Sequence, residues 1–221
     1  MRTVQGEVER ALNAMTGEEN RVTASGRTDA GVHAICQTAH FDTSKTWDAA
    51  KFVGGLNSYL PRDIRILSAY EVPDGFHARY SAKCKTYEYV MYRSDRERAV
   101  YLERAARIPE GADTEKMRRA AGYFIGTHDF ASFCAADADT KTSVRTVTRS
   151  DISLRDGLIV FTVTSDGFLY NMVRIMTGLL IRIATGGEPE YAVSEVIAAR
   201  DRTLARDTAP ACGLYLKKVY Y

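Results

Sequence analysis

The sequence of 221 residues predicts an α+β fold of two lobes. Stretches with apolar residues at helical spacing alternate with stretches rich in β-branched and aromatic residues, and a chain of this length can bury two modest cores. We expect mainly antiparallel strands, with the helices packed on one side of them. Residues 95–111 are charged and irregular, which is typical of a crossing between lobes, so we place the lobes at 1–105 and 106–221.

The first lobe is expected to open on a helix, because apolar residues recur at helical spacing behind Thr3, a residue type that caps helices. Further along, alternating segments and segments rich in β-branched and aromatic residues predict strands. The elements expected in this lobe are a helix at 4–16, a strand at 35–42, a helix at 46–59 and strands at 64–72 and 83–92.

The clearest element of the second lobe is a long helix at 169–185, which should end at Gly186-Gly187. Its predicted core stripe consists of Met172, Val173, Met176, Leu179, Leu180 and Ile183. The other elements expected in this lobe are a helix at 113–125, a loop through 126–130, strands near 144–154 and 158–165, a helix at 190–200 and a strand at 213–220.

Composition and charge argue against several classes of protein. No apolar run approaches the roughly 20 residues of a membrane span, and no export signal precedes the first helix, so we expect a cytoplasmic protein. The four cysteines are far apart, and His33 and His40 have no third ligand at metal spacing, so no metal site is expected. The net charge is only +2, so a nucleic-acid surface must come from basic clusters, such as those at 83–85, 93–107, 118–119 and 217–218.

Asp29 is the candidate for a catalytic centre. It stands between Gly26 and Gly31, which can adopt positive φ, so the segment predicts a tight turn that presents the carboxylate to a substrate. A carboxylate held in this way can act as a nucleophile or a base. The same local pattern also fits an aspartate that only caps a turn, and its immediate neighbours do not separate the two interpretations.

Motifs in a fixed order extend over nearly the whole chain. They include Gly26-Arg27-Thr28-Asp29-Ala30-Gly31-Val32-His33-Ala34, Phe76-His77-Ala78-Arg79, Tyr87-Glu88-Tyr89, Gly126-Thr127-His128-Asp129-Phe130, Met172-Val173-Arg174 and Gly213-Leu214-Tyr215-Leu216. By these motifs the sequence resembles the tRNA pseudouridine synthase A (TruA) family.

The resemblance implies the pseudouridine synthase fold, in which the sheets of two α/β lobes join into one extended sheet. It also implies the reaction, which is isomerisation of uridine to pseudouridine at positions 38–40 of the tRNA anticodon stem-loop by a homodimer. Moving the glycosidic bond from N1 to C5 involves no net redox change and no group donor. No metal, nucleotide or other cofactor is therefore expected.

By the same resemblance, Asp29 matches the catalytic aspartate of the family. It either attacks C1′ directly or removes the 2′ proton to form a glycal, and the sequence leaves both routes open. Arg174 matches the arginine that pairs with this aspartate, and a cation there would keep Asp29 ionised while RNA phosphates surround it. Without the motif, Arg174 would be interpreted as a solvated charge on a helix.

Three further site roles follow from the resemblance. Tyr87 matches an active-site tyrosine whose ring stacks on the flipped base or whose phenol assists proton removal from C5. Leu214 and Leu216 either wall the uracil pocket or belong to the core. Arg27 resembles an arginine that holds RNA and helps the target base to leave the stack, although an ordinary surface arginine at a turn fits the same position.

The sequence departs from the family pattern at its start. Family members begin with a strand and loop carrying Tyr-Asp-Gly and Gly-Trp-Gln, whereas this sequence begins Met1-Arg2-Thr3. We expect either a start upstream or a truncated form, in which loss of a first strand would expose unpaired backbone groups. This departure motivates the alternative function of a truncated, non-catalytic protein that binds or folds tRNA. A more remote alternative is a glycosidase, which would need two carboxylates, but the sequence offers no obvious second one.

Overall fold

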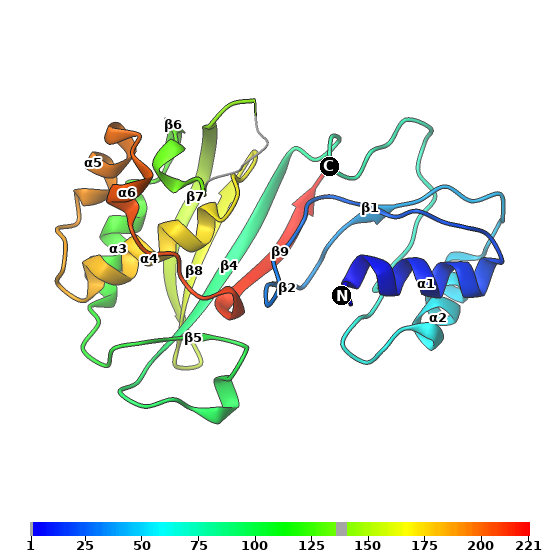
Figure 1. Cartoon of the computed structure of the whole chain (residues 1–221), viewed down its shortest axis with the longest axis horizontal. Helices are drawn as coiled ribbons and strands as arrows, with labels where there is room; N and C mark the ends of the chain where they lie inside the picture. The colour runs from blue at the N-terminus through cyan, green and yellow to red at the C-terminus, as the bar shows by residue number, and fades with distance from the viewer. Residues whose placement is uncertain (1, 136–140) are drawn as a thin grey trace. The chain divides into compact units, whose positions relative to one another are not determined.

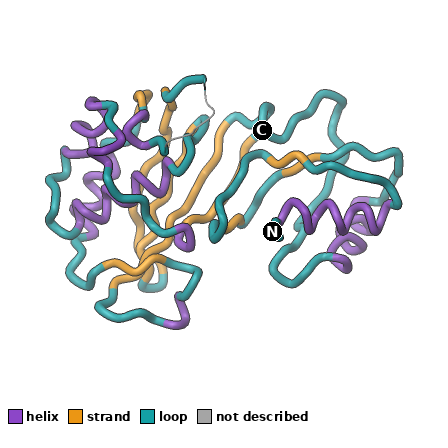
Figure 2. Tube along the Cα trace, viewed as in Figure 1, coloured by secondary structure: helices purple, strands orange, loops and turns teal. Residues whose placement is uncertain are grey.

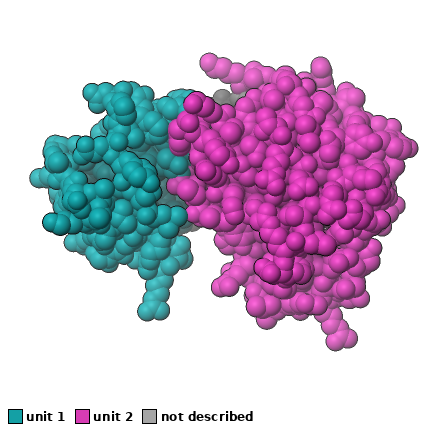
Figure 3. Space-filling model, turned by 180° about the vertical axis from the view of Figure 1, so that it is seen from behind, with its two compact units in different colours: residues 1–27, 38–82 teal, residues 28–37, 83–221 magenta. Residues whose placement is uncertain are grey.

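The computed structural model describes residues 2–135 and 141–221, and the chain divides into two compact units (Figure 3). Unit 1 consists of residues 1–27 and 38–82, and unit 2 of residues 28–37 and 83–221. The predicted lobes at 1–105 and 106–221 have other boundaries than these two units, and they stay a prediction. The predicted α+β class is confirmed, because a mixed sheet carries helices on one side (Figure 1).

Unit 1 is built on two helices with well-defined ends. Helix α1 (Val4–Thr16) begins as predicted, because the Gly6 N–H donates to the Thr3 hydroxyl oxygen at 3.1 Å, and Gly17 ends it with a φ of 74°. Helix α2 (Ala49–Tyr59) starts behind the cap Asp48 and ends before the Leu60-Pro61 pair. Together they bury a small core of Ala11, Leu12, Val22, Phe52, Leu56, Leu60 and Ile64.

Two predicted strands of the first lobe are wrong. Only short pieces form near 35–42, namely β2 (His33–Ala34) and β3 (Ala39–His40), and β3 pairs with β1 (Thr23–Ala24). Residues 64–72 form no strand (Figure 2). The Asn57 amide takes the place of a partner strand there, since it donates to the Ile66 carbonyl oxygen at 2.9 Å and accepts the Ile66 N–H at 2.8 Å. A β-branched segment can therefore pack on the core without a sheet.

The sheet of unit 2 has seven strands among the described residues, in the order β2-β9-β4-β8-β7-β6 with β5 beside β4. The pairs β2–β9 and β4–β5 are parallel and the others antiparallel. The strands not yet given are β4 (Cys84–Arg93), β5 (Ala106–Ile108), β6 (Gly126–Asp129), β7 (Val144–Arg155), β8 (Leu158–Ser165) and β9 (Leu214–Tyr220). The four strands predicted from 83 onward are confirmed. The predicted loop at 126–130 contains β6, whose Gly-Thr-His-Asp sequence has low strand propensity and extends by pairing with β7.

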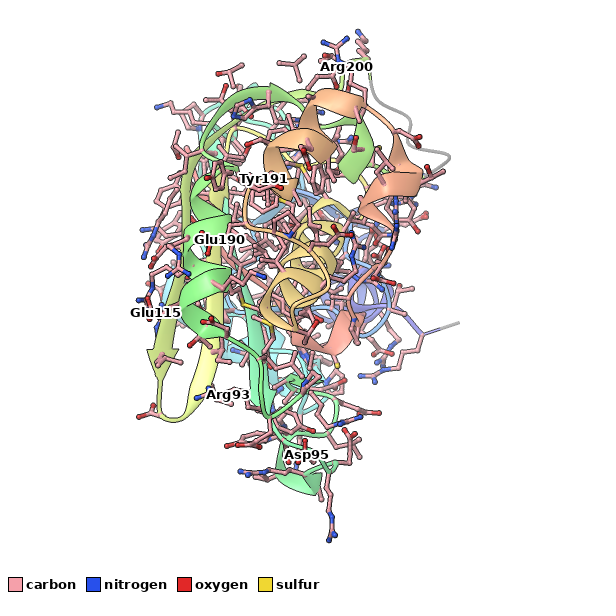
Figure 4. All side chains as sticks on the ribbon, turned by 90° about the vertical axis from the view of Figure 1, so that its left-hand side faces the viewer. Arg93, Asp95, Glu115, Glu190, Tyr191 and Arg200 are labelled. Atoms are coloured by element: carbon pink, nitrogen blue, oxygen red, sulfur yellow. The ribbon has the colours of Figure 1, made fainter. Side chains whose placement is uncertain are left out.

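The helices of unit 2 lie on one side of this sheet (Figure 1). They are α3 (Thr114–Gly122), α4 (Met172–Ala184), α5 (Ala192–Ala199) and α6 (Arg202–Ala205), with 3-10 turns η1 (Ala99–Tyr101), η2 (Ala131–Phe133) and η3 (Ala211–Gly213). Glu190, labelled in Figure 4, lies just before α5 and forms an ion pair of 2.6 Å with Arg119 of α3. In the described part of the chain, no helix is both long and apolar enough to span a membrane.

Helix α4 lies in the main core. All six residues of its predicted stripe are buried, packed with residues of β8 such as Phe161 and Val163. The helix ends where predicted, because Gly186 has a φ of 85° and the Gly187 N–H donates to the Arg182 carbonyl oxygen at 2.9 Å. A helix fixed along its length and at its end gives a rigid base to the side chains of its first turn.

Candidate active site

The turn that carries Asp29 is built on Gly31. The Val32 N–H donates to the Asp29 carbonyl oxygen at 3.1 Å, and Gly31 has a φ of 82°, which other residues rarely adopt. Gly26, the other glycine of the pattern, has no positive φ. Directly after the turn, β2 pairs with β9, and His33 lies opposite Tyr215. The turn is thus anchored to the sheet of unit 2.

Asp29 and Arg174 form an ion pair within unit 2, although 145 residues separate them in the sequence. The distance from Nη1 of Arg174 to Oδ2 of Asp29 is 3.0 Å. The Arg174 side chain is 18% exposed and the Asp29 side chain 33%, so the pair is partly withdrawn from water.

Arg174 is itself held by two other acceptors. Its Nε donates to the Ala209 carbonyl oxygen at 2.8 Å, and its Nη1 donates to Oδ1 of Asn171 at 2.9 Å. The backbone contributes as well, since the Ala209 N–H donates to the Arg174 carbonyl oxygen at 3.0 Å. The guanidinium plane is therefore fixed before any substrate arrives, which is the arrangement that electrostatic catalysis requires.

Tyr87 lies on β4, where its backbone pairs with Leu216 on one side and Val163 on the other. Its ring meets Phe168 edge to face with centroids 4.9 Å apart. Burial, and to a lesser extent the negative charge of Asp29, raise the pKa of Tyr87 to about 12. The phenol is therefore protonated at neutral pH, and it can stack or donate a hydrogen bond but cannot start as a phenolate base.

The model of a known protein family, described as tRNA pseudouridine synthase, matches residues 1–81 and 120–221. The chain belongs to this tRNA pseudouridine synthase family. The tRNA pseudouridine synthase A of Geobacillus sp. is 46% identical over 100% of this chain and 89% of its own length. Those of Acetivibrio thermocellus and Halalkalibacterium halodurans are 43% and 47% identical, over 100% and 96% of this chain and 90% and 81% of their own lengths.

The segments matched by the pseudouridine synthase model contain both Asp29 and Arg174 but not Tyr87. Tyr87 does lie within the alignment to the Geobacillus synthase, which covers the whole chain. The structure places Asp29, Arg174 and Tyr87 in one unit, and the negative charge of Asp29 contributes to the raised pKa of Tyr87. The catalytic roles of the three residues stay predictions.

The other residues predicted for the pseudouridine synthase site differ in their surroundings. Leu214 and Leu216 are buried, and Leu214 is part of the main core against which Tyr87 packs. The Leu216 carbonyl oxygen accepts the Ile35 N–H at 2.9 Å, which helps to hold the segment behind the Asp29 turn. Arg27 is exposed and belongs to unit 1. Whether these residues contact uracil or RNA stays a prediction.

The surroundings of the basic cluster at 118–119 and of His33 are now defined. Arg118 and Arg119 of the basic cluster at 118–119 pair with Glu115 and Glu190, so their charges are largely neutralised. The His33 ring stacks on the Tyr215 ring with centroids 4.6 Å apart, and its Nε2 forms a hydrogen bond of 2.7 Å with the Glu103 carbonyl oxygen. Within the described residues, no group of three or more His, Cys, Asp or Glu side chains is arranged to hold a metal ion.

Sequence reasoning missed the residues that support Arg174. Asn171 could have been noticed, since an asparagine directly before an apolar helical run is a signal for a helix start. The backbone of Ala209 offered no signal, because any residue has a carbonyl oxygen. The position of Ala209 is set by the path of the segment 207–213. The same segment supplies the Pro210 carbonyl oxygen, which accepts a hydrogen bond of 2.6 Å from the Tyr89 hydroxyl.

Proposed function

We propose that this member of the family is a tRNA pseudouridine synthase that isomerises uridine at positions 38–40 of the anticodon stem-loop. The observation that carries the proposal is the ion pair of 3.0 Å between Arg174 and Asp29, with the aspartate presented on a tight turn. Family membership supports an isomerase that acts on tRNA. The anticodon positions rest on the resemblance of the motifs to those of the family.

The reaction requires an ionised carboxylate next to the ribose of the target uridine. Among the described residues, Oδ2 of Asp29 is held by Arg174, while Oδ1 has no hydrogen-bond donor. The free oxygen can attack C1′ or take the 2′ proton, and both routes end when the base is rejoined through C5. In either case the fixed guanidinium holds the carboxylate in one orientation, so the site does not have to rearrange during the reaction.

Tyr87 supports the same chemistry from the sheet. With its pKa raised to about 12, it offers the extruded uracil an aromatic ring and a hydroxyl donor. Positions 39 and 40 lie in a base-paired stem, so the base must be extruded at a cost of a few kcal/mol. We assign to Arg27, which is exposed, the role of occupying the vacated space.

The proposal includes a homodimer and a cytoplasmic location, where tRNA is modified. The alternative, a non-catalytic protein that binds or folds tRNA, is not favoured, because the chain has the acidic turn and its arginine partner in contact. The two functions differ in one product. A synthase forms pseudouridine, whereas a binding protein leaves uridine unchanged.

Release of tritium from an anticodon stem-loop labelled at C5 of uridine tests the proposal, because the proton at C5 leaves when the base is rejoined. The full chain should release tritium and form pseudouridine. Asp29→Asn should abolish release while tRNA binding changes less than about threefold. Asp95→Asn, a change of the same kind at an exposed residue, should behave like the wild type. Turnover in Asp29→Asn, or none in the wild type, would overturn the assignment.

A further inference from the structure

Asn171 has an unusual backbone for the residue before a helix. Its φ and ψ are 61° and 7°, in the left-handed region, where residues other than glycine and asparagine are rare. Both sides of the residue are fixed, because the Met172 N–H donates to the Leu169 carbonyl oxygen at 3.1 Å and the Ile175 N–H donates to that of Asn171 at 3.0 Å. This conformation sets the direction in which the side chain leaves the backbone.

The Asn171 side chain does not serve the helix that it precedes. Asparagine is among the best N-caps, yet Asn171 makes no side-chain cap to the first turn of α4. Its Oδ1 instead accepts a hydrogen bond of 2.9 Å from Nη1 of Arg174. The side-chain oxygen that could have capped the helix thus binds the arginine instead.

The nitrogen that Asn171 contacts is the one that holds Asp29. Nη1 carries two hydrogens, of which one is directed to Oδ1 of Asn171 and the other to Oδ2 of Asp29 at 3.0 Å. The Nε hydrogen is directed to the Ala209 carbonyl oxygen. The two supporting acceptors are neutral, so they orient the guanidinium without competing with the carboxylate for its charge.

We propose that Asn171 is a positioning residue for the Asp29–Arg174 pair, and this rests on the proposed synthase function. Asparagine combines tolerance of the left-handed backbone with a neutral acceptor at this place. Glycine keeps the backbone and loses the acceptor. Aspartate keeps both but introduces a second negative charge at Nη1.

Asn171→Gly separates the acceptor from the backbone. We expect kcat to fall about tenfold or more, since small misplacements of catalytic groups are costly, while KM for tRNA and the midpoint of thermal unfolding stay within error of the wild type. Asn171→Asp should lose more, because its carboxylate competes with Asp29 for Arg174. The matched control is Asp156→Gly, another residue with positive φ, in the turn between β7 and β8, which should keep wild-type kcat.

A double-mutant cycle tests whether Asn171 acts through Arg174. In an Arg174→Lys background, Asn171→Gly should change the single-turnover rate by less than twofold, because an ammonium group cannot bridge the two acceptors. Equal loss in both backgrounds would mean that Asn171 acts independently and would overturn the proposal.

A measurement without turnover separates this proposal from the proposed function. In NMR spectra of ¹⁵N-arginine protein, the Arg174 guanidinium should show restricted rotation in the wild type and faster rotation in Asn171→Gly. If the wild type forms no pseudouridine but this difference is present, the proposed function fails and the positioning by Asn171 stands. If the rotation of Arg174 is unchanged in Asn171→Gly, the positioning role is disproved.

Discussion

Gly178 of α4 and Asp207 meet backbone to backbone, so that a Cβ at residue 178 would lie 2.5 Å from the Asp207 carbonyl oxygen. This glycine lets the segment 207–213 cross the helix one turn beyond Arg174. Arg182 holds the same region from the next turn of α4, since its Nη1 donates to the Ala205 carbonyl oxygen at 2.8 Å. The approach at Gly178 thus brings Ala209 to Arg174.

Gly178→Ala is expected to destabilise the protein by about 1–3 kcal/mol, because backbone cannot move aside as a flexible side chain can. The sign of the change in the free energy of unfolding is informative, since helix propensity alone would make the alanine variant more stable by about 1 kcal/mol. Urea unfolding measures the change. Gly122→Ala in α3, where a Cβ would meet nothing within 4 Å, is the control and should lose no stability. A stable, fully active Gly178→Ala protein would contradict the contact.

Arg174→Lys keeps the positive charge but loses the planar fork that reaches Asp29, Asn171 and Ala209 together. We expect kcat to fall about 100-fold or more, with KM for the stem-loop changed by less than about threefold. Arg10→Lys on the surface of α1 is the control for the substitution type. Wild-type kcat in Arg174→Lys would show that charge alone suffices.

Tyr87→Phe keeps the aromatic ring and removes the hydroxyl, whereas Tyr87→Leu removes both. Because the pKa of Tyr87 is raised to about 12, less than about one phenol in a thousand is ionised at pH 8, so a phenolate base is nearly absent and we assign the main role to stacking of the ring. We therefore expect Tyr87→Phe to retain at least about tenfold more activity than Tyr87→Leu in the tritium-release assay. Equal loss in the two variants would assign the role to the hydroxyl.

The sequence predicted the parts of the fold that depend on local signals. The first helix begins directly after its cap Thr3 and the long helix ends before Gly186 as expected, because caps and glycines act over a few residues. Residues 64–72 were misassigned because the partner of Ile66 is the side chain of Asn57, which no strand pattern contains.

The candidate site, like the fold, is predicted from the sequence only in part. Spacing and composition left Asp29 ambiguous, and only the resemblance connected it to Arg174, which lies 145 residues away. Nothing predicted the supports of Arg174, because one is a backbone carbonyl oxygen and the other is an asparagine whose pattern indicates only a helix start. A backbone carbonyl oxygen used as an acceptor leaves no trace in residue type, because every residue has one.

The raised pKa of Tyr87 predicts a loss of stability in alkali. Below pH 10 both the folded and the unfolded chain keep the phenolic proton, so Tyr87 adds no pH dependence. Between pH 10 and about 12 the unfolded chain loses the proton and the folded chain keeps it, so the free energy of unfolding falls as pH rises, by at most about 1.4 kcal/mol per pH unit. Burial raises the pKa of Tyr89 as well, and this adds to the slope. Urea unfolding from pH 9 to 11.5 measures it: Tyr87→Phe should flatten the slope, while Tyr70→Phe, at a residue 80% exposed, should not. A slope unchanged in Tyr87→Phe would mean that the folded state does not hold the Tyr87 proton.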